Sequence, residues 1–183
     1  GGRGIIGSYL YNYLNANFNI TPIDNQGDDS TYSAINLDLT DQQKVNLFVR
    51  DCSNYDTLIF LVGLAHKKGK GTDLADFENI NYQTLVNLLV ALDDNNKIPE
   101  KIMLASTISV YGEKLKRQYY DESLQPEPYS SYAVTKLMAE NYLLENYAAK
   151  SWILRFGPVY SRDFLLNVDR RTKMGGRFYR VGK

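Results

Sequence analysis

Short apolar segments alternate with longer amphipathic segments along most of this chain. The apolar segments have the length and residue types of β-strands, and they lie at 19–24, 34–38, 57–62, 101–106 and 151–156. The amphipathic segments repeat their apolar residues at helical spacing, and they lie at 8–14, 40–51, 73–94 and 130–149. Strands that alternate with helices of this length predict an α/β fold: a doubly wound, Rossmann-like parallel sheet with helices on both faces.

Three details of this pattern make the prediction specific. The run 57–62, TLIFLV, is almost continuously apolar, which is typical of a strand buried on both faces. Thr40 and Gln43 have the spacing of a capping box, so Thr40 is expected to cap the helix that follows. Trp152 opens the last strand and is expected in the core.

The composition excludes several kinds of partner. The 183 residues suffice for one domain with a core, and 21 basic residues balance 21 acidic ones, so no global field favours nucleic acid. Cys52 is the single cysteine and His66 the single histidine, which leaves no internal disulfide and no Cys/His zinc cluster. No apolar run has membrane-spanning length. We therefore expect a cytoplasmic protein without a metal, nucleic-acid or membrane partner.

Three glycines, Gly1, Gly4 and Gly7, precede the first helical segment at intervals of three residues. Bare backbone N–H groups at a helix N-terminus bind pyrophosphate, and glycine lets the phosphates approach. The spacing G-x-x-G-x-x-G differs from the G-x-G-x-x-G of dinucleotide-binding turns, and glycine-rich turns also cap helices that bind nothing. By itself the turn therefore indicates a dinucleotide site only weakly.

Asp24 strengthens this indication. It ends the next predicted strand, at about the distance where an acidic residue bonds the ribose hydroxyls of a dinucleotide. A carboxylate there repels a 2′-phosphate and favours NAD over NADP. Arg3, inside the turn, favours the opposite choice because an arginine can bind a 2′-phosphate. We give Asp24 more weight and expect NAD.

A second group of polar residues follows the predicted strand at 101–106. Thr107 stands directly after it, and Tyr132 and Lys136 are four residues apart on a predicted helix, hence on one face. A nearby ammonium, together with a cationic nicotinamide, favours the phenolate, so we expect a lowered Tyr132 pKa. Tyr132 would then exchange a proton with a sugar hydroxyl while hydride moves to or from the cofactor, and Thr107 would orient the same oxygen.

Several stretches together resemble the extended short-chain dehydrogenase/reductase superfamily, in particular its NAD-dependent epimerase/dehydratase family. The resemblance runs from Gly1 to about Tyr160. The stretches that carry it are GGRGIIG, PIDN, LDLTD, IFLVGLAH with NYQTLVNLL, STISVYG, PEPYSSYAVTK and ILRFGPVYS. Departures from the family pattern are Val62 and Gly63 after the third strand, Thr84 and Leu85 in the long helix, and Ser161 where glycine is usual.

The resemblance implies a catalytic set and a cofactor set. The catalytic residues would be Thr107, Tyr132 and Lys136. The residues that bind the cofactor would be Gly1, Arg3, Gly4, Ile5, Ile6, Gly7, Asp24, Asp38, Leu39, Leu61, Gly63, Asn81, Tyr132 and Lys136. Asp38 and Leu39 would be the pair that contacts adenine.

The resemblance also narrows the reaction. Family dehydratases carry Asp-Glu after the catalytic Thr, where this chain has Ile108 and Ser109. C4 epimerisation of a nucleotide-sugar is the leading prediction, and a nucleotide-sugar reductase, dehydrogenase or dehydratase stays open. A non-catalytic dinucleotide-binding redox sensor is the alternative from another class.

The ends of the chain carry further expectations. The first strand of a 3-2-1-4-5-6 sheet is central, so about five to ten apolar residues are expected before Gly1. Residues 1–160 would form the dinucleotide-binding domain and 161–183 the start of a substrate-binding region. The family often forms homodimers through helices, and Leu137, Leu143 and Leu144 would provide apolar surface for that contact. For His66, Tyr111 and Tyr160, contact with the sugar is possible, and a loop or packing role is the simpler expectation.

Overall fold

The computed structural model describes residues 1–25, 32–65, 73–112, 119–162 and 164–165, and the backbone of 173–174 and 177–178. Within these residues the helices are α1 (Ile5–Leu14), α2 (Gln42–Asp51), α3 (Leu74–Glu78), the π-helix η1 (Asn79–Gln83), α4 (Thr84–Asp94), the 3₁₀-helices η2 (Ile108–Tyr111) and η3 (Ala148–Lys150), and α5 (Ser131–Tyr147). The strands are β1 (Ile23–Asp24), β2 (Ile35–Asn36), β3 (Thr57–Phe60), β4 (Lys101–Thr107), β5 (Ser151–Phe156), β6 (Lys173–Met174) and β7 (Arg177–Phe178). The predicted order of strands and helices is confirmed.

The strands before β6 pair in parallel, as predicted. β4 lies between β3 and β5, with Ile102 opposite both Leu58 and Ser151. β1 pairs with β2 in a separate ladder, so the described strands form two parallel sheets where one was expected. β6 and β7 form an antiparallel pair within residues 161–183, the segment expected to begin a substrate-binding region.

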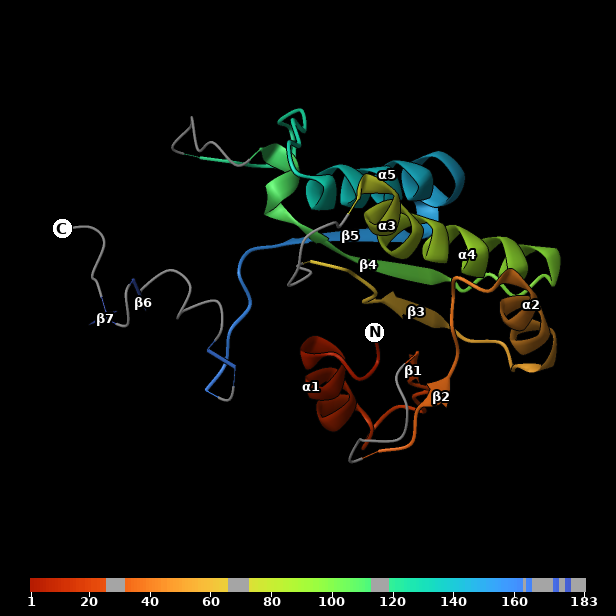
Figure 1. Cartoon of the computed structure of the whole chain (residues 1–183). Helices are drawn as coiled ribbons and strands as arrows, with labels where there is room; N and C mark the ends of the chain where they lie inside the picture. Colours follow the sequence, from red (N-terminus) through yellow and green to blue (C-terminus); the bar gives the residue numbers. More distant parts are fainter. Residues whose placement is uncertain are drawn as a thin grey trace.

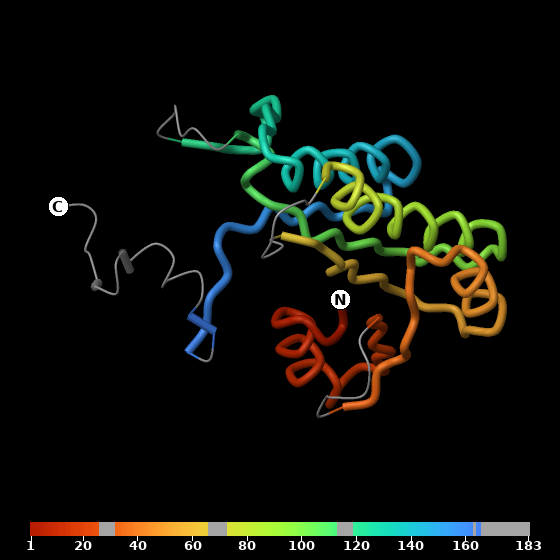
Figure 2. Tube along the Cα trace, in the orientation of Figure 1, coloured from red at the N-terminus to blue at the C-terminus, as the bar shows by residue number. Residues whose placement is uncertain are grey.

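The first residues of the chain lie between the two parallel sheets. The Gly2 N–H donates to the Ile23 carbonyl of β1 at 2.9 Å. On the other side, a Cβ added to Gly1 would stand 2.7 Å from the Leu61 carbonyl carbon after β3. Figure 2 shows this red segment beside β1 and the end of β3. The glycine turn thus connects the two sheets through backbone contacts.

Helices cover one face of the β3–β4–β5 sheet. Figure 1 shows α3, α4 and α5 together on that side, and the core lies beneath them, with Leu85, Leu89 and Ile102 at 0% exposed. On the opposite face, Trp152 is 57% exposed and Leu154 40%. The expectation of Trp152 in the core is therefore wrong.

The alternation of side chains along the strands explains these exposures. In β5, buried or half-buried residues alternate with exposed ones, because successive side chains point to opposite faces. β3 alternates in the same way, with Ile59 38% exposed and Phe60 2%. An apolar run in sequence therefore did not indicate burial on both faces here.

The helical segment at 73–94 is interrupted by one π-helical turn. α3 passes into η1 and then into α4 within a continuous helical run. Asn81 in η1 is 0% exposed, and its side chain bonds groups outside its own helix. Such an inserted turn is frequent at functional sites.

The N-cap of α2 differs from the prediction. Asp41 is the N-cap and accepts from the Lys44 N–H at 3.2 Å. Thr40 instead donates its backbone N–H and its hydroxyl to the Asp38 carboxylate, at 2.9 and 2.7 Å. The Thr40 capping box is therefore wrong, because a side-chain turn on Asp38 precedes the helix.

Candidate active site

The glycine turn packs so tightly that side chains would disrupt it. A Cβ on Gly7, the one buried residue of α1, would stand 2.6 Å from the Gly1 carbonyl oxygen and would also collide with the Gly2 carbonyl. Gly4 is the N-cap of α1 and provides no side-chain cap. The first turn of α1 also contains no acidic residue. This helix end therefore has the properties that attract an anion.

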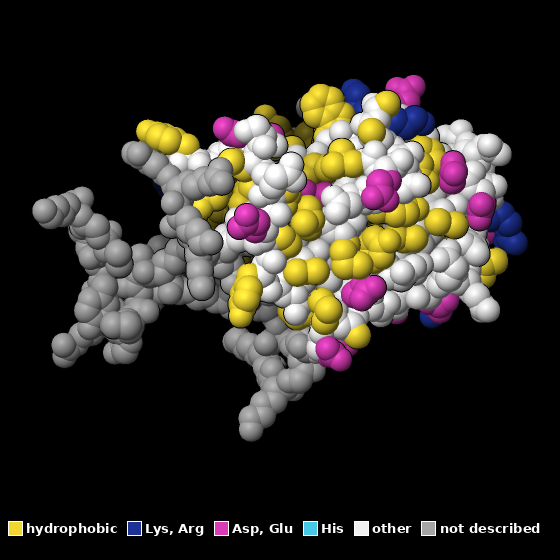
Figure 3. All heavy atoms as spheres, turned by 90° about the horizontal axis from the view of Figure 1, so that it is seen from above, with side chains coloured by type: hydrophobic (Ala, Val, Ile, Leu, Met, Phe, Trp, Pro, Cys, Tyr) yellow, Lys and Arg dark blue, Asp and Glu magenta, His cyan; other side chains and the backbone are white. Residues whose placement is uncertain are grey.

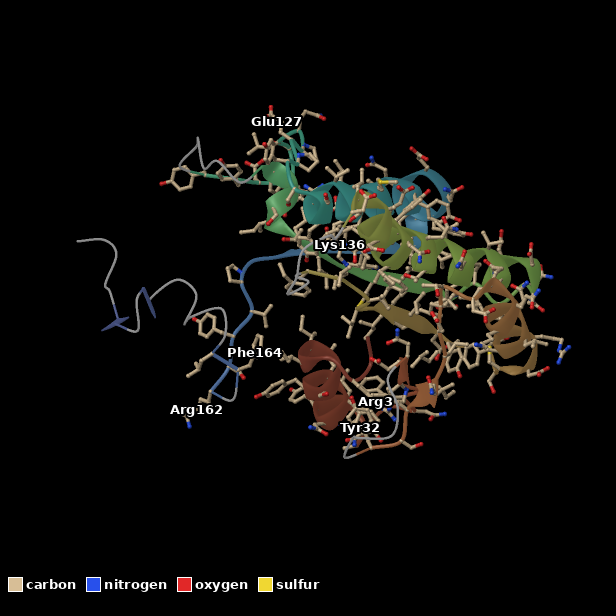
Figure 4. The ribbon with its side chains drawn as sticks, viewed as in Figure 1. Arg3, Tyr32, Glu127, Lys136, Arg162 and Phe164 are labelled. Atoms are coloured by element: carbon tan, nitrogen blue, oxygen red, sulfur yellow. The ribbon has the colours of Figure 1, made fainter. Side chains whose placement is uncertain are left out.

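Two further residues hold the turn in place. The Arg3 backbone N–H donates to Asp24 Oδ2 at 3.0 Å, and Asp24 is 8% exposed. The Tyr32 hydroxyl donates to the Gly2 carbonyl, and its ring stacks on Tyr11 at 4.1 Å between centroids. Figure 4 shows Arg3 and Tyr32 close together beside α1. Asp24 thus lies where the sequence predicted it, and Tyr32 was missed because it follows no recognisable motif.

Thr107 and Tyr132 meet at the carboxyl end of β4. The Thr107 side chain lies close enough to the Tyr132 phenol to act on its pKa, and Thr107, which is 7% exposed, accepts from the Ser109 N–H at 3.2 Å. Ser130 caps α5 by accepting from the Ala133 N–H at 3.4 Å, so Tyr132 lies in the first turn of the helix. The structure therefore brings together the two hydroxyls that the sequence predicted as partners.

The pKa of Tyr132 differs from the expectation. Burial raises it above its ordinary value, and the hydrogen bond with Thr107 acts in the opposite direction. Lys136 donates to the carbonyl oxygens of Val62 at 2.9 Å and Ala105 at 3.0 Å. The protein's own groups thus do not lower the Tyr132 pKa, because desolvation outweighs the stabilisation of the phenolate.

Lys136 is buried between α5 and the sheet, as Figure 4 shows, and is 2% exposed. Burial lowers its pKa from 10.5 to about 8, and the negative charge of Glu140 opposes this shift. A Cβ on Gly63 would stand 3.1 Å from its Nζ, so glycine leaves room for the ammonium. Gly63 was a departure from the family pattern, and the structure gives it a steric reason.

Asn81 connects the loop after β3 to α5. It accepts from the Leu64 N–H at 2.6 Å, and its amide donates to the Leu64 carbonyl at 3.2 Å and to Thr135 Oγ1 at 3.1 Å. These bonds fix the loop that contains Gly63 against the helix that carries Lys136. The structure thus places Asn81 behind the predicted site.

The other predicted cofactor residues do not contact Thr107, Tyr132 or Lys136 in the structure. The Asp38 carboxylate accepts from the Thr40 hydroxyl two residues later, and Leu39 lies in the core, where its carbonyl accepts from the Asn87 amide at 2.9 Å. Leu61 lies beside the glycine turn. Ile5 and Ile6 stand in the first turn of α1, and both line an open, largely apolar pocket with Tyr9 and Val159. Contact of any of these residues with a cofactor stays a prediction.

The sequence analysis missed a buried network behind Lys136. Its members are Ser106, Tyr111, Glu140 and Arg155, and Glu140 is 0% exposed. A signal was present, because Glu140 follows Lys136 by four residues and so shares its helix face. Arg155 lies on β5, and no local sequence pattern links it to Glu140 on α5.

The remaining candidates add little to the site. His66 lies outside the described residues. Tyr160 is 66% exposed, whereas Tyr111 is half-buried against Arg155. Across the described part of the chain, no group of three His, Cys, Asp or Glu side chains could hold a metal ion. Among the same residues, no helix combines the length and apolar character needed to cross a membrane.

The fold and this arrangement define a class of protein. A glycine turn before α1, an acid at the end of β1 and a Thr–Tyr–Lys set at the edge of a parallel sheet are the parts of a dinucleotide-binding oxidoreductase-type fold. The chain belongs to the NAD dependent epimerase/dehydratase family, whose family model matches residues 1–177.

Solved structures agree with this membership. UDP-glucuronic acid 4-epimerase from Bacillus cereus, in complex with NAD, is 28% identical with a TM-score of 0.69, over 87% of this chain and 55% of that one. UDP-glucose 4-epimerase from Thermus thermophilus, also with NAD, is 27% identical with a TM-score of 0.72, over 86% and 55%. A mutated uronate dehydrogenase, 21% identical with a TM-score of 0.70 over 86% and 56%, shares the fold.

The chain thus spans little more than half the length of these structures. Comparison with curated protein sequences gave no match.

Proposed function

We propose that this protein is an NAD-dependent epimerase that inverts C4 of a nucleotide-linked sugar by transient hydride transfer. The observation that carries the proposal is the position of Thr107 beside Tyr132, with Lys136 buried one helical turn further on. The family membership and the 4-epimerases among the similar structures support it.

The residues present fit a dinucleotide. The glycine turn leaves a helix N-terminus without a side-chain cap, which suits a pyrophosphate. Asp24 lies beside the same turn and would accept from ribose hydroxyls, which favours NAD over NADP. When bound, the nicotinamide would supply the hydride acceptor and donor that this set of side chains lacks.

The side chains of this chain would handle the proton. Tyr132 would remove the proton from a sugar hydroxyl as the carbon beneath it loses hydride, which gives a ketone, and would return that proton when hydride is added to the other face. Thr107 would hydrogen-bond the same oxygen. Since burial raises the Tyr132 pKa and the protein's own groups do not lower it, this role requires a further cation beside the phenol, which the oxidised nicotinamide would supply.

Oxidation or reduction of a nucleotide-sugar is the second candidate. It needs the same three residues, and the dehydrogenases among the similar structures show that the fold also occurs in proteins of that name. A 4,6-dehydratase is disfavoured, because Ile108 and Ser109 offer no acid and base after Thr107. A redox sensor would not need Thr107, Tyr132 and Lys136 together.

A substrate panel separates these candidates. The protein is incubated with NAD and with UDP-, dTDP- and GDP-linked sugars, and both NADH absorbance and product stereochemistry are recorded. Isomerisation without net NADH supports the epimerase, and stoichiometric NADH supports the dehydrogenase. NAD binding without turnover of any sugar supports the sensor and contradicts the proposal.

We further propose a homodimer that uses the helix-covered side, and a substrate role for residues 161–183. Figure 3 shows hydrophobic side chains in a band across that side, where Val90 is 41% exposed and Leu144 51%. Leu143 was expected on this surface, but it is 0% exposed and belongs to the core. Leu144→Lys would shift the molar mass measured by light scattering to that of a monomer. An unchanged mass would contradict this surface.

A further inference from the structure

A charge pair with a fully buried carboxylate lies directly behind Lys136. Glu140 follows Lys136 by one turn of α5, and both are buried, at 0% and 2% exposed. Arg155 on β5 donates to Glu140 Oε2 from Nη2 at 2.7 Å and from Nε at 3.1 Å. Ser106 on β4 donates to Glu140 Oε1. One carboxylate therefore joins α5 to two strands of the sheet.

Arg155 also connects to the predicted site through β4 and the 3₁₀ turn after it. Ser106 immediately precedes Thr107 and lies opposite Arg155 in the β4–β5 ladder. Arg155 Nη1 also donates to the Tyr111 hydroxyl at 2.6 Å, in the 3₁₀ turn that Thr107 caps. A buried ion pair stabilises a fold no better than well-packed apolar side chains of similar volume. Fold stability alone therefore does not account for this pair.

We propose that Glu140 and Arg155 set the charge state of Lys136: the Glu140 carboxylate holds the proton on the Lys136 ammonium, and Arg155 limits this effect by neutralising the carboxylate. Both are positioning residues, because they act through Lys136. The consequence for catalysis rests on the proposed function, whereas the effect on the Lys136 proton does not depend on it.

Among the residues that the structure describes, the groups that contact Lys136 from other elements are neutral. They are the carbonyl oxygens of Val62 and Ala105, with the backbone of Gly63 beside them. The titratable groups on α5 and on the described elements packed against it are Asp76, Glu78, Tyr82, Lys101, Tyr111, Tyr132, Glu140, Tyr142, Glu145, Tyr147, Lys150 and Arg155. Among them, Glu140 is the group whose charge raises the pKa of Lys136 against the effect of burial.

This arrangement predicts opposite effects for the two partners. Glu140→Gln removes the negative charge and leaves the Arg155 cation, so the titration midpoint of Lys136 should fall below about 8. An opposite charge within about 4–6 Å of a group shifts its pKa by about one unit or more. Arg155→Gln leaves Glu140 fully negative, so the midpoint should rise. The double variant Glu140→Gln/Arg155→Gln should lie between the two.

The experiment follows Lys136 by NMR with ¹³C-labelled lysine, from neutral to alkaline pH, in the protein without added cofactor. Lys136→Met identifies the resonance. Glu145→Gln, on the exposed side of the same helix, and Arg50→Gln, exposed on α2, are the matched controls and should leave the midpoint where the wild-type protein has it. Backbone amide spectra show whether each variant is folded.

Shifts of opposite sign support the proposal, and unchanged midpoints or shifts of one sign overturn it. If either single variant fails to fold, the sign of the shift in the other decides alone. Shifts of opposite sign in a protein that turns over no sugar would overturn the proposed function and leave this inference standing. Turnover that requires Tyr132, with unchanged Lys136 midpoints, would support the proposed function and overturn this inference.

Discussion

The Tyr132 phenol on α5 and the Thr107 side chain at the end of β4 lie beside each other, although they are 25 positions apart in sequence. The parallel sheet makes this possible, because β4 ends at the edge over which the first turn of α5 lies. This arrangement places a proton acceptor beside a second hydroxyl, which is the geometry that the proposed reaction needs.

Tyr132→Phe removes the phenol and keeps the ring. We expect sugar turnover to fall by about 10²–10⁴-fold, the usual range for losing a general acid–base group, with little change in NAD affinity. Initial rates and calorimetric NAD titration measure the two quantities. Tyr129→Phe, three residues earlier and 86% exposed, is the matched control and should keep wild-type activity. Equal activity in both variants would remove Tyr132 from the mechanism.

Lys136 should make the free energy of unfolding depend on pH. Burial lowers its pKa from 10.5 to about 8, so between these values the unfolded chain binds a proton that the folded protein does not. The cost of burying the ammonium is therefore fully present below pH 8 and lost by pH 10.5. Relative to Lys136→Met, the wild-type protein should gain up to about 3 kcal/mol over this range, at about 1.4 kcal/mol per unit.

Urea unfolding of both proteins at a series of pH values measures that gain. The comparison with Lys136→Met cancels the titration of the other groups. A difference between the two proteins that stays constant from neutral pH to pH 10.5 would show that Lys136 keeps its ordinary pKa.

Lys97, which belongs to no sequence motif, should contribute to stability by capping α2. Its ammonium donates to the carbonyl oxygens of Val49, Arg50 and Cys52, at 2.9, 2.9 and 2.8 Å, and so caps the C-terminal end of α2. Lys97→Met should lower the free energy of unfolding by about 1.5–3 kcal/mol, the range for hydrogen bonds to a charged group.

Chemical denaturation of the Lys97 variant needs an exposed lysine for comparison. Lys44, 65% exposed and paired with Asp41 at 3.1 Å, provides it. Lys44→Met should cost less than about 1 kcal/mol, as is usual for surface ion pairs. Equal losses in the two variants would contradict the capping role of Lys97.

Gly7→Ala should displace the glycine turn. The added methyl group would stand 2.6 Å from the Gly1 carbonyl oxygen, and the backbone would have to move. We expect a lower melting temperature and at least about tenfold weaker NAD binding, since a loss of 1.4 kcal/mol already gives tenfold. Gly157→Ala, where nothing lies within 4 Å of the added methyl group, should change neither. NAD binding by Gly7→Ala at wild-type affinity would contradict the role of the turn.

Local patterns sufficed to predict the order of elements and the positions of the predicted catalytic residues. The β5 limits, Ser151–Phe156, agree with the predicted segment because a short apolar run is a local property of the sequence. Thr107 and Tyr132 could be placed at the same edge because parallel strands end there. Asp24 was located by its distance from the glycine turn.

The sequence by itself determined the parallel α/β class and the residue types at the strand ends, since period and spacing are properties of neighbouring residues. Only the tertiary structure decided that Trp152 is exposed, that Arg155 pairs with Glu140, and that burial raises the Tyr132 pKa. Each of these depends on which distant segments exclude water from a side chain. Desolvation and long-range charge pairing arise when the segments pack together, and no periodicity in the chain records them.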